Sequence, residues 1–144
     1  PSNMPLALGV PGHGWRAASI DTTTARALQW APLALPVALA NRVGPLQRRI
    51  WPRVQHDLCL AEAPIAAPAR AWRNYVIEWR HDGARFSIDG STVLETARVP
   101  QGPLGMVLWV DNQWMVATPR GRFGWGVSAT PTQWLDIAQL TVET

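Results

Sequence analysis

The sequence predicts an all-β fold, a sandwich or barrel of short antiparallel strands. Thirteen prolines and eleven glycines interrupt the 144 residues so often that no long helical period persists. Short runs of alternating apolar and polar residues lie between these breaks, and the clearest of them, 72–97, contains two tight turns. An apolar fraction of 47% and a charged fraction of 16% are typical of one folded domain, which we expect to span residues 1–144.

The N-terminal half is expected to contribute strands that are less regular. The runs "WRAASID" (15–21) and "RALQWAPL" (26–33) are interpreted as strands or strand edges. The run 31–49 leaves two alternatives open, because its alanines and leucines favour a short helix and its three prolines favour a loop. The run "WPRVQHDLCLAEA" (51–63) alternates and is predicted to be a strand, with the thiol of Cys59 small and buried within it.

The run 72–97 predicts a three-stranded meander. Tyr75, Ile77 and Trp79 share one face of the first strand because side chains alternate along a strand. The "HDG" sequence then supplies a hairpin turn, since glycine tolerates a positive φ. "ARFSI" returns with Phe86 and Ile88 on its apolar face, and a second turn at "DG" leads into "TVLETA". We expect these five apolar side chains to face a shared core.

Two further strands are expected in the C-terminal part. "QGPLGMVLWV" (101–110) is almost continuously apolar, which predicts a strand buried on both faces. "QWLDIAQLTVET" (133–144) alternates and predicts a closing strand, with a bulge in its middle.

Composition excludes several classes of protein. All thirteen basic residues are arginines, and they are scattered apart from the group "LQRRIWPR", so the net charge of +3 does not indicate a nucleic-acid interface. Cys59 is the single cysteine, which rules out an intrachain disulfide. No apolar run reaches the length of a membrane span, and no signal peptide is recognisable. The opening "PSNMPLALG" lacks an initiator methionine, so we expect a fragment or a processed product.

The C-terminal half resembles a known family. "WRNYVIEWRHDGARFSIDGSTV" is similar to the aromatic–x–Tyr–x–Ile–x–Trp and Phe–x–Val–Asp–Gly pattern of the concanavalin A-like lectins and glucanases, especially the laminarinase-like family 16 glycoside hydrolases. "PQGPLGMVLWVDNQW" and "QWLDIAQLTV" resemble that family's later strands, so the resemblance covers residues 72–144. It implies a jelly roll of two antiparallel sheets with a concave face that binds carbohydrate.

The chain departs from that family where catalysis is concerned. The family's catalytic strand carries Glu–x–Asp–x–x–Glu, which supplies a nucleophile and a proton donor. No such triplet occurs here: Asp57 and Glu62 are five residues apart, and Glu78 has no acidic neighbour two positions away. We therefore predict no catalytic residues and no turnover by this chain alone. A relative without catalysis and a chain whose catalytic strand lies elsewhere both remain open.

The candidate ligand-binding residues lie in two stretches. "VLWVDNQWMV" (107–116) places polar side chains between two indoles, which could stack on a sugar ring and bind its hydroxyl groups. An equally weighted alternative is a bend in which Asp111 and Asn112 bond their own backbone. "TPRGRFGWG" (118–126) is a glycine-rich loop that could rim the same cleft. The predicted residues are Trp109, Asp111, Asn112, Gln113, Trp114, Arg122 and Trp125.

Metal and cofactor chemistry is not indicated. The three histidines, His13, His56 and His81, are far apart in the sequence, and we predict neither a metal site nor a cofactor. The predicted function is carbohydrate binding, with a glycan as partner and without nucleic acid or membrane. The alternatives are an enzyme with its catalytic strand outside this chain or with chemistry other than glycoside cleavage, and a structural domain without a small ligand.

Overall fold

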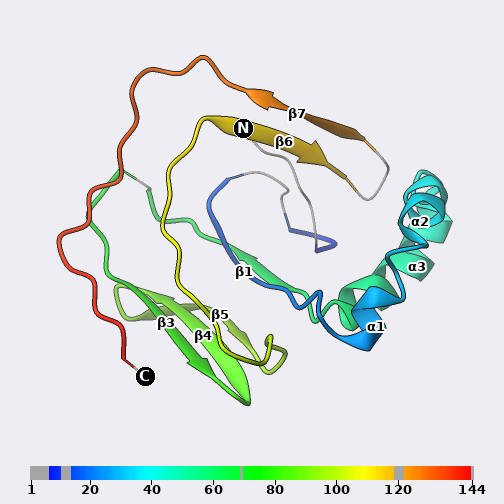
Figure 1. The fold of residues 1–144 in the computed structure, drawn as a ribbon, viewed down its shortest axis with the longest axis horizontal. Coiled ribbons are helices and arrows are strands. Elements are labelled where there is room, and N and C mark those ends of the chain that lie inside the picture. The colour runs from blue at the N-terminus through cyan, green and yellow to red at the C-terminus, as the bar shows by residue number, and fades with distance from the viewer. Residues whose placement is uncertain (1–6, 11–13, 69, 119–121, 144) are drawn as a thin grey trace.

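The computed structural model describes residues 7–10, 14–68, 70–118 and 122–143. In this part of the chain, antiparallel strands provide most of the regular structure, as the sequence predicts (Figure 1). The strands are β1 (Arg16–Ser19), β2 (Ala61–Pro64), β3 (Tyr75–Arg80), β4 (Gly83–Ile88), β5 (Ser91–Thr96), β6 (Gln113–Ala117) and β7 (Phe123–Val127). They form three small sheets, ordered β1-β2, β3-β4-β5 and β6-β7. The helices are α1 (Ala25–Leu28), α2 (Ala34–Ala40) and α3 (Gly44–Asp57).

The helices correct two strand predictions. Residues 26–33 begin in α1, whose N-cap Thr24 accepts a hydrogen bond from the N–H of Ala27 at 3.1 Å. Residues 51–57 belong to α3, in which the buried side chains of Gln47 and Val54 are seven residues apart and therefore share a face. The run 51–63 therefore combines the end of α3 with the start of β2, and the two periodicities together give the appearance of one alternating strand.

The end of α3 also changes the expected setting of the cysteine. Cys59 has a φ of 50° and is half-buried, so it lies in the turn after the helix rather than inside a strand.

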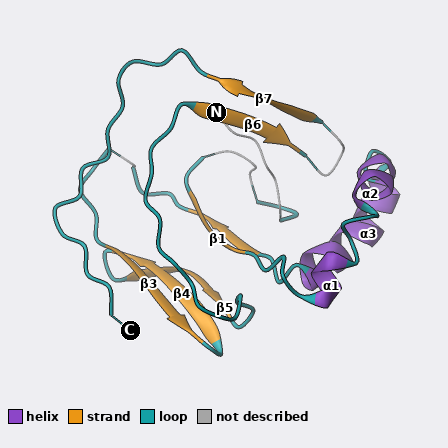
Figure 2. Ribbon diagram, in the orientation of Figure 1, coloured by secondary structure: helices purple, strands orange, loops and turns teal. Residues whose placement is uncertain are grey.

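For residues 31–49, where the sequence left a helix and a loop as alternatives, the structure adopts the helix. Pro45 lies in the first turn of α3, where its missing N–H costs no hydrogen bond. Figure 2 shows the three helices gathered at one end of the molecule.

The β1-β2 sheet joins segments that are far apart in the sequence. Its register pairs Arg16 with Pro64 and Ser19 with Ala61, and the carboxylate of Glu62 is buried in an ion pair with Arg16. The hydroxyl of Ser19 donates to the carbonyl oxygen of Arg98, which follows β5. The small sheet is therefore held beside the meander by a buried polar contact.

The meander forms where the sequence predicts it. β4 pairs with both neighbours, with a bulge between Phe86 and Ser87 on the β5 side. Ile88 is buried, and its neighbour on the same face, Ala84, is buried as well. The three apolar side chains that β3 places on this face are not, since Tyr75 is 45%, Ile77 60% and Trp79 37% exposed. The prediction of one shared core is therefore wrong for β3, whose only ring contact in the described chain is that of Tyr75 with Trp15, at a centroid distance of 6.2 Å.

The predicted strands at 101–110 and 133–144 are not formed in the described residues. Residues 101–112 and 128–143 carry no strand pairing and are almost entirely exposed, including Trp109 and Trp134. Figure 1 shows 101–112 within the long connection that leads into the β6-β7 hairpin and 128–143 as the long stretch that runs from the hairpin toward the C-terminus. An apolar sequence pattern was therefore not sufficient for either stretch to pair as a strand.

The buried apolar side chains are few and mostly small. In the described residues they are Ala17, Ala27, Val54, Ala84, Ile88 and Val99. No helix in this part of the chain has the length and apolar character needed to cross a membrane.

Candidate functional site

The β6-β7 hairpin has two faces of different character. Its register pairs Gln113 with Val127, Met115 with Trp125 and Ala117 with Phe123. Cross-strand partners lie on the same face of a sheet, so Gln113, Met115, Trp125 and Val127 share one face, and Phe123, two residues before Trp125, lies on it as well. The opposite face carries Trp114 and Val116 against two glycines of β7.

The first of these faces is an aromatic platform, which we define as Gln113, Met115, Phe123, Trp125 and Val127. Phe123 is 68% and Trp125 71% exposed. Their ring centroids are 5.2 Å apart and their planes are tilted by 52°. Residues two apart on a strand point in the same direction, so both rings are presented together from one strand. The amide of Gln113, which is also exposed, lies on the same face.

Trp114 lies on the other face and is half-buried. A Cβ added to Gly126 would come within 2.9 Å of Nε1 of its indole, and one added to Gly124 within 3.7 Å of Cζ3. The indole therefore covers the backbone of β7, and the two glycines make room for it. Trp114 and Trp125 cannot face each other across one cleft, because a single strand register places them on opposite faces.

Asp111 and Asn112 make local contacts that begin the hairpin. The Asp111 carboxylate accepts a hydrogen bond from the N–H of Gln113 at 3.0 Å, the geometry of an Asx turn. The Asn112 side chain donates to the carbonyl oxygen of Ser128, and the N–H of Ser128 donates to the carbonyl oxygen of Asn112. The contact of Asp111 is the local bend of the structural alternative, whereas Asn112 bonds across the hairpin to Ser128. Both side chains remain exposed beside the platform.

Trp109 and Arg122 complete the predicted set. Trp109 is 70% exposed on the connection before β6 and belongs to neither face of the hairpin. Arg122 lies before β7, where its N–H donates to the Thr118 hydroxyl at 3.2 Å and its carbonyl oxygen accepts from the N–H of Thr118. The centre of the predicted glycine-rich loop, 119–121, lies outside the described residues. The structure thus groups Gln113 with Trp125 and separates both from Trp109 and Trp114.

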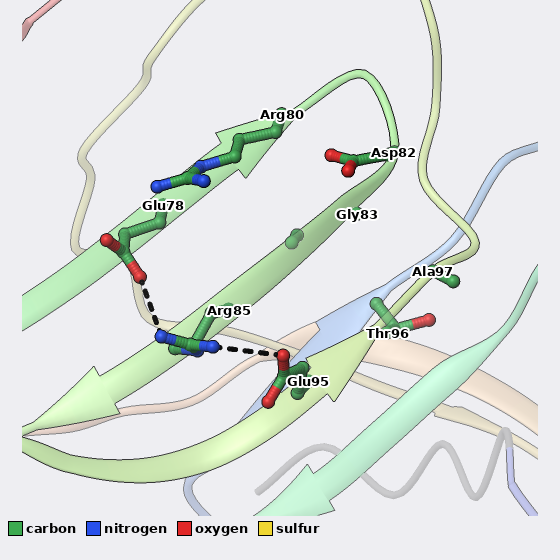
Figure 3. Close-up of a pocket in the computed structure, with 9 residues that line it drawn as sticks. Glu78, Arg80, Asp82, Gly83, Arg85, Glu95, Thr96 and Ala97 are labelled. Carbon is green, nitrogen blue, oxygen red and sulfur yellow. Dashed lines mark hydrogen bonds and ion pairs between the residues drawn. The ribbon is translucent and has the colours of Figure 1, made fainter.

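A second group of polar residues lies on the outward face of the meander. The guanidinium of Arg85 is 3.6 Å from a carboxylate oxygen of Glu78 and 3.1 Å from one of Glu95 (Figure 3). The hydrogen bond and charge of Glu95, with the charge of Glu78, raise the pKa of Arg85. With Arg80 and Asp82, these residues line an open pocket of about 320 Å³.

The charged group contains two carboxylates, so it is the place to ask whether the chain could carry a catalytic acidic pair. Glu78 and Glu95 come from β3 and β5, two strands of one sheet that are separated by β4, a relation that the sequence did not indicate. Each carboxylate nevertheless contacts the same arginine. A glycosidase needs two carboxyl groups in separate roles, one of which donates a proton to the leaving group, whereas here both contact one guanidinium. Asp57 and Glu62, in turn, lie on α3 and β2 rather than on one strand.

The histidines do not converge in the part of the chain that the structure describes. Nδ1 of His56 is 3.2 Å from a carboxylate oxygen of Asp57, while the carbonyl oxygen of His81 accepts a hydrogen bond from the Gln101 side chain. His13 lies outside the described residues. Among those residues, no three side chains of the His, Cys, Asp and Glu types come together in a way that could hold a metal ion.

Sequence reasoning missed Phe123 and Met115 as members of the platform. The signal was present in "FGWGV", where large and small residues alternate and so place Phe123 beside Trp125. In comparisons with known proteins, no family model, curated protein or solved structure matches the chain.

Proposed function

We propose that the chain is a carbohydrate-binding β-domain without catalytic residues, and that its ligand stacks on the aromatic platform of β6 and β7. The observation that carries the proposal is the pair Phe123 and Trp125, two strongly exposed rings in contact on one strand face. Exposed aromatic rings are costly in water, and the C–H faces of a pyranose ring offer a suitable apolar surface.

Polar side chains beside the rings would supply the hydrogen bonds. The Gln113 amide has both donors and an acceptor, which suit sugar hydroxyl groups. Asp111 and Asn112 precede it directly and are exposed, although Asp111 already accepts from the backbone. An open platform binds weakly, so we expect a dissociation constant in the micromolar to millimolar range, equivalent to roughly 4–8 kcal/mol.

The test is a titration of intrinsic tryptophan fluorescence with soluble laminarin, together with retention of the chain on insoluble β-glucan. We expect a saturable change with the wild-type chain. Trp125→Ala should weaken binding about tenfold, equivalent to about 1.4 kcal/mol. Phe123→Ala should weaken it by a smaller factor, because the indole offers the larger ring.

Trp134→Ala is the matched control. Trp134 is as exposed as Trp125 but lies on the unpaired stretch after β7. If its removal weakens binding as much as that of Trp125, the platform is not the site. A wild-type chain that binds neither laminarin nor insoluble β-glucan contradicts this function for these ligands.

The jelly-roll architecture implied by the family resemblance is part of the same proposal. It is supported by the antiparallel strands and by the formation of the meander that carries most of the resemblance. For the enzymatic alternative, the acidic pair to test is Glu78 and Glu95, whose carboxylates both contact Arg85 on the meander. Hydrolysis of laminarin that disappears in Glu78→Gln or Glu95→Gln would overturn the non-catalytic assignment.

A further inference from the structure

The chain exposes far more surface than a compact monomer of its size. Its accessible surface is 10710 Å². A folded monomer of 15.9 kDa is expected to expose roughly 7,400 Å². The surplus of roughly 3,000 Å² on one chain is comparable with or larger than the share of each partner in an obligate contact, where the two together bury about 2,000–5,000 Å². The chain therefore has accessible surface to spare for a contact with a partner.

One part of that area is an unpaired strand edge. In the described chain β3 pairs with β4 on one side and with no strand on the other. The N–H of Asp89 donates to the carbonyl oxygen of Asn74, and hydrogen-bonded pairs alternate along an antiparallel ladder. The backbone groups of residues 76, 78 and 80 therefore point to β4, and those of Tyr75, Ile77 and Trp79 point outward.

The side chains of the same three residues are apolar and exposed. They occupy one face of β3, and Ile77 in the middle is the most exposed of them. An edge with free backbone groups and an apolar face is a template for the addition of another strand.

We propose that β3 pairs antiparallel with β3 of a second copy of this chain, about a two-fold axis at Ile77. This register places Ile77 opposite its own symmetry mate and Tyr75 opposite Trp79 of the other copy. The outward backbone groups could then form up to about six hydrogen bonds. Two meanders become one six-stranded sheet, and Tyr75, Ile77 and Trp79 each gain an apolar neighbour from the other copy.

The charges on the opposite face favour this register over its neighbour. With Ile77 on the axis, Glu78 lies opposite Val76 of the other copy and Arg80 lies opposite Asn74. A shift that places residue 78 on the axis would set the two Glu78 carboxylates directly against each other, which is destabilising. A self-complementary contact of this kind also closes after two copies.

Cysteine cross-linking tests the register. In a Cys59→Ser background, Ile77→Cys places two thiols on a hydrogen-bonded pair, with a Cα separation of about 5.5 Å that permits a disulfide. We expect mild oxidation to convert this variant into a covalent dimer. Thr92→Cys, on the far edge strand β5, is the matched control and should remain uncross-linked, since about five strand spacings would separate the two thiols.

Sedimentation of the unlabelled chain tests the assembly itself. We expect a dimer at tens of micromolar. Ile77→Pro should be monomeric with its meander intact, because the N–H at this position points away from β4. Near-UV circular dichroism establishes that the variant is folded, and Ile77→Lys provides a second variant that places like charges on the axis.

Three results would overturn the proposal. The first is a wild-type monomer up to hundreds of micromolar, which is also the result expected if another segment of the same chain covers β3. The second is a dimer that Ile77→Pro and Ile77→Lys leave unchanged, since its contact lies elsewhere. The third is a series of open, growing oligomers, because a two-fold contact closes.

Discussion

The meander of β3–β5 and the stretches around the β6-β7 hairpin are both apolar, yet they reach different structures. Residues 75–96 form a continuous ladder with buried side chains at Ala84 and Ile88. Residues 101–112 and 128–143 are as rich in large apolar side chains and form no ladder in the described chain. The two regions differ in the sequence distance between each strand and the segment with which it would pair.

In the meander the partners are supplied locally. A two-residue turn joins β3 to β4, and Asp89, with a φ of 49°, joins β4 to β5 together with Gly90. Such turns close short loops at a low cost in entropy. Residues 101–112 have no turn that brings an adjacent strand alongside them, so their pairing depends on a distant segment. Alternation therefore predicts a strand most securely where turn residues flank it.

The largest expected change in the free energy of unfolding comes from replacing one isoleucine by alanine in each of the two regions. Ile88→Ala should lower the free energy of unfolding by about 2–3 kcal/mol, because it empties part of a buried site. Ile137→Ala, on the exposed stretch after β7, should change it by less than about 0.5 kcal/mol. Urea unfolding measures both. Equal losses would mean that residues 128–143 are packed in solution as the meander is.

The meander could be predicted from the sequence because its strands are adjacent in the chain and are joined by recognisable turn residues. Sequence reasoning failed for 51–57 because a helix with buried residues at Gln47 and Val54 can imitate alternation over a short window. Among the predicted ligand-binding residues, the structure places Gln113 and Trp125 on one face of the hairpin and Trp114 on the other, with Trp109 before β6. The interpretation from the sequence treated 107–116 as one strand, whereas the turn at Asp111 delays β6 until Gln113.

A second pair of variants compares a glycine without room for a Cβ, in the meander, with a glycine that has room for one, outside it. A Cβ on Gly83 would lie 2.8 Å from the carbonyl oxygen of Thr96, so Gly83→Ala should force β4 and β5 apart and cost about 1–3 kcal/mol. Gly105→Ala meets nothing within 4 Å and should be neutral or slightly stabilising, since it restricts the unfolded chain. Thermal unfolding distinguishes them. A tolerated Gly83→Ala would contradict the close approach of β4 and β5.

A smaller effect is expected at the back of the platform. Gly126→Ala should displace the Trp114 indole, because the new Cβ would be 2.9 Å from Nε1. The near-UV circular dichroism should change while stability falls by about 1 kcal/mol or less. Gly124→Ala, with its nearest atom at 3.7 Å, is the control and should leave the spectrum unchanged. Similar spectra for both variants would place the indole elsewhere.

The smallest effect is a pH dependence in the turn between β4 and β5. Hydrogen bonds from the N–H of Asn74 and from Arg73 lower the pKa of Asp89. A lowered pKa in the folded state stabilises the fold above the unfolded value of about 3.9, and this contribution is lost as the pH falls through the folded pKa. Asp89→Asn should therefore be less stable than wild type at pH 7 and should approach it below about pH 4. A difference that is constant across this range would exclude the ionised carboxylate as its source.

Hydrogen exchange of the native chain at low concentration tests the central comparison most directly. The amides of Val76, Glu78 and Arg80, which point to β4, should exchange slowly together with those of β4. The amides of residues 104–110 and 133–143 should exchange close to the rate of an unstructured peptide, since they have no strand partner. Protection of 104–110 equal to that of the meander would contradict the account, because it would require a ladder along this stretch.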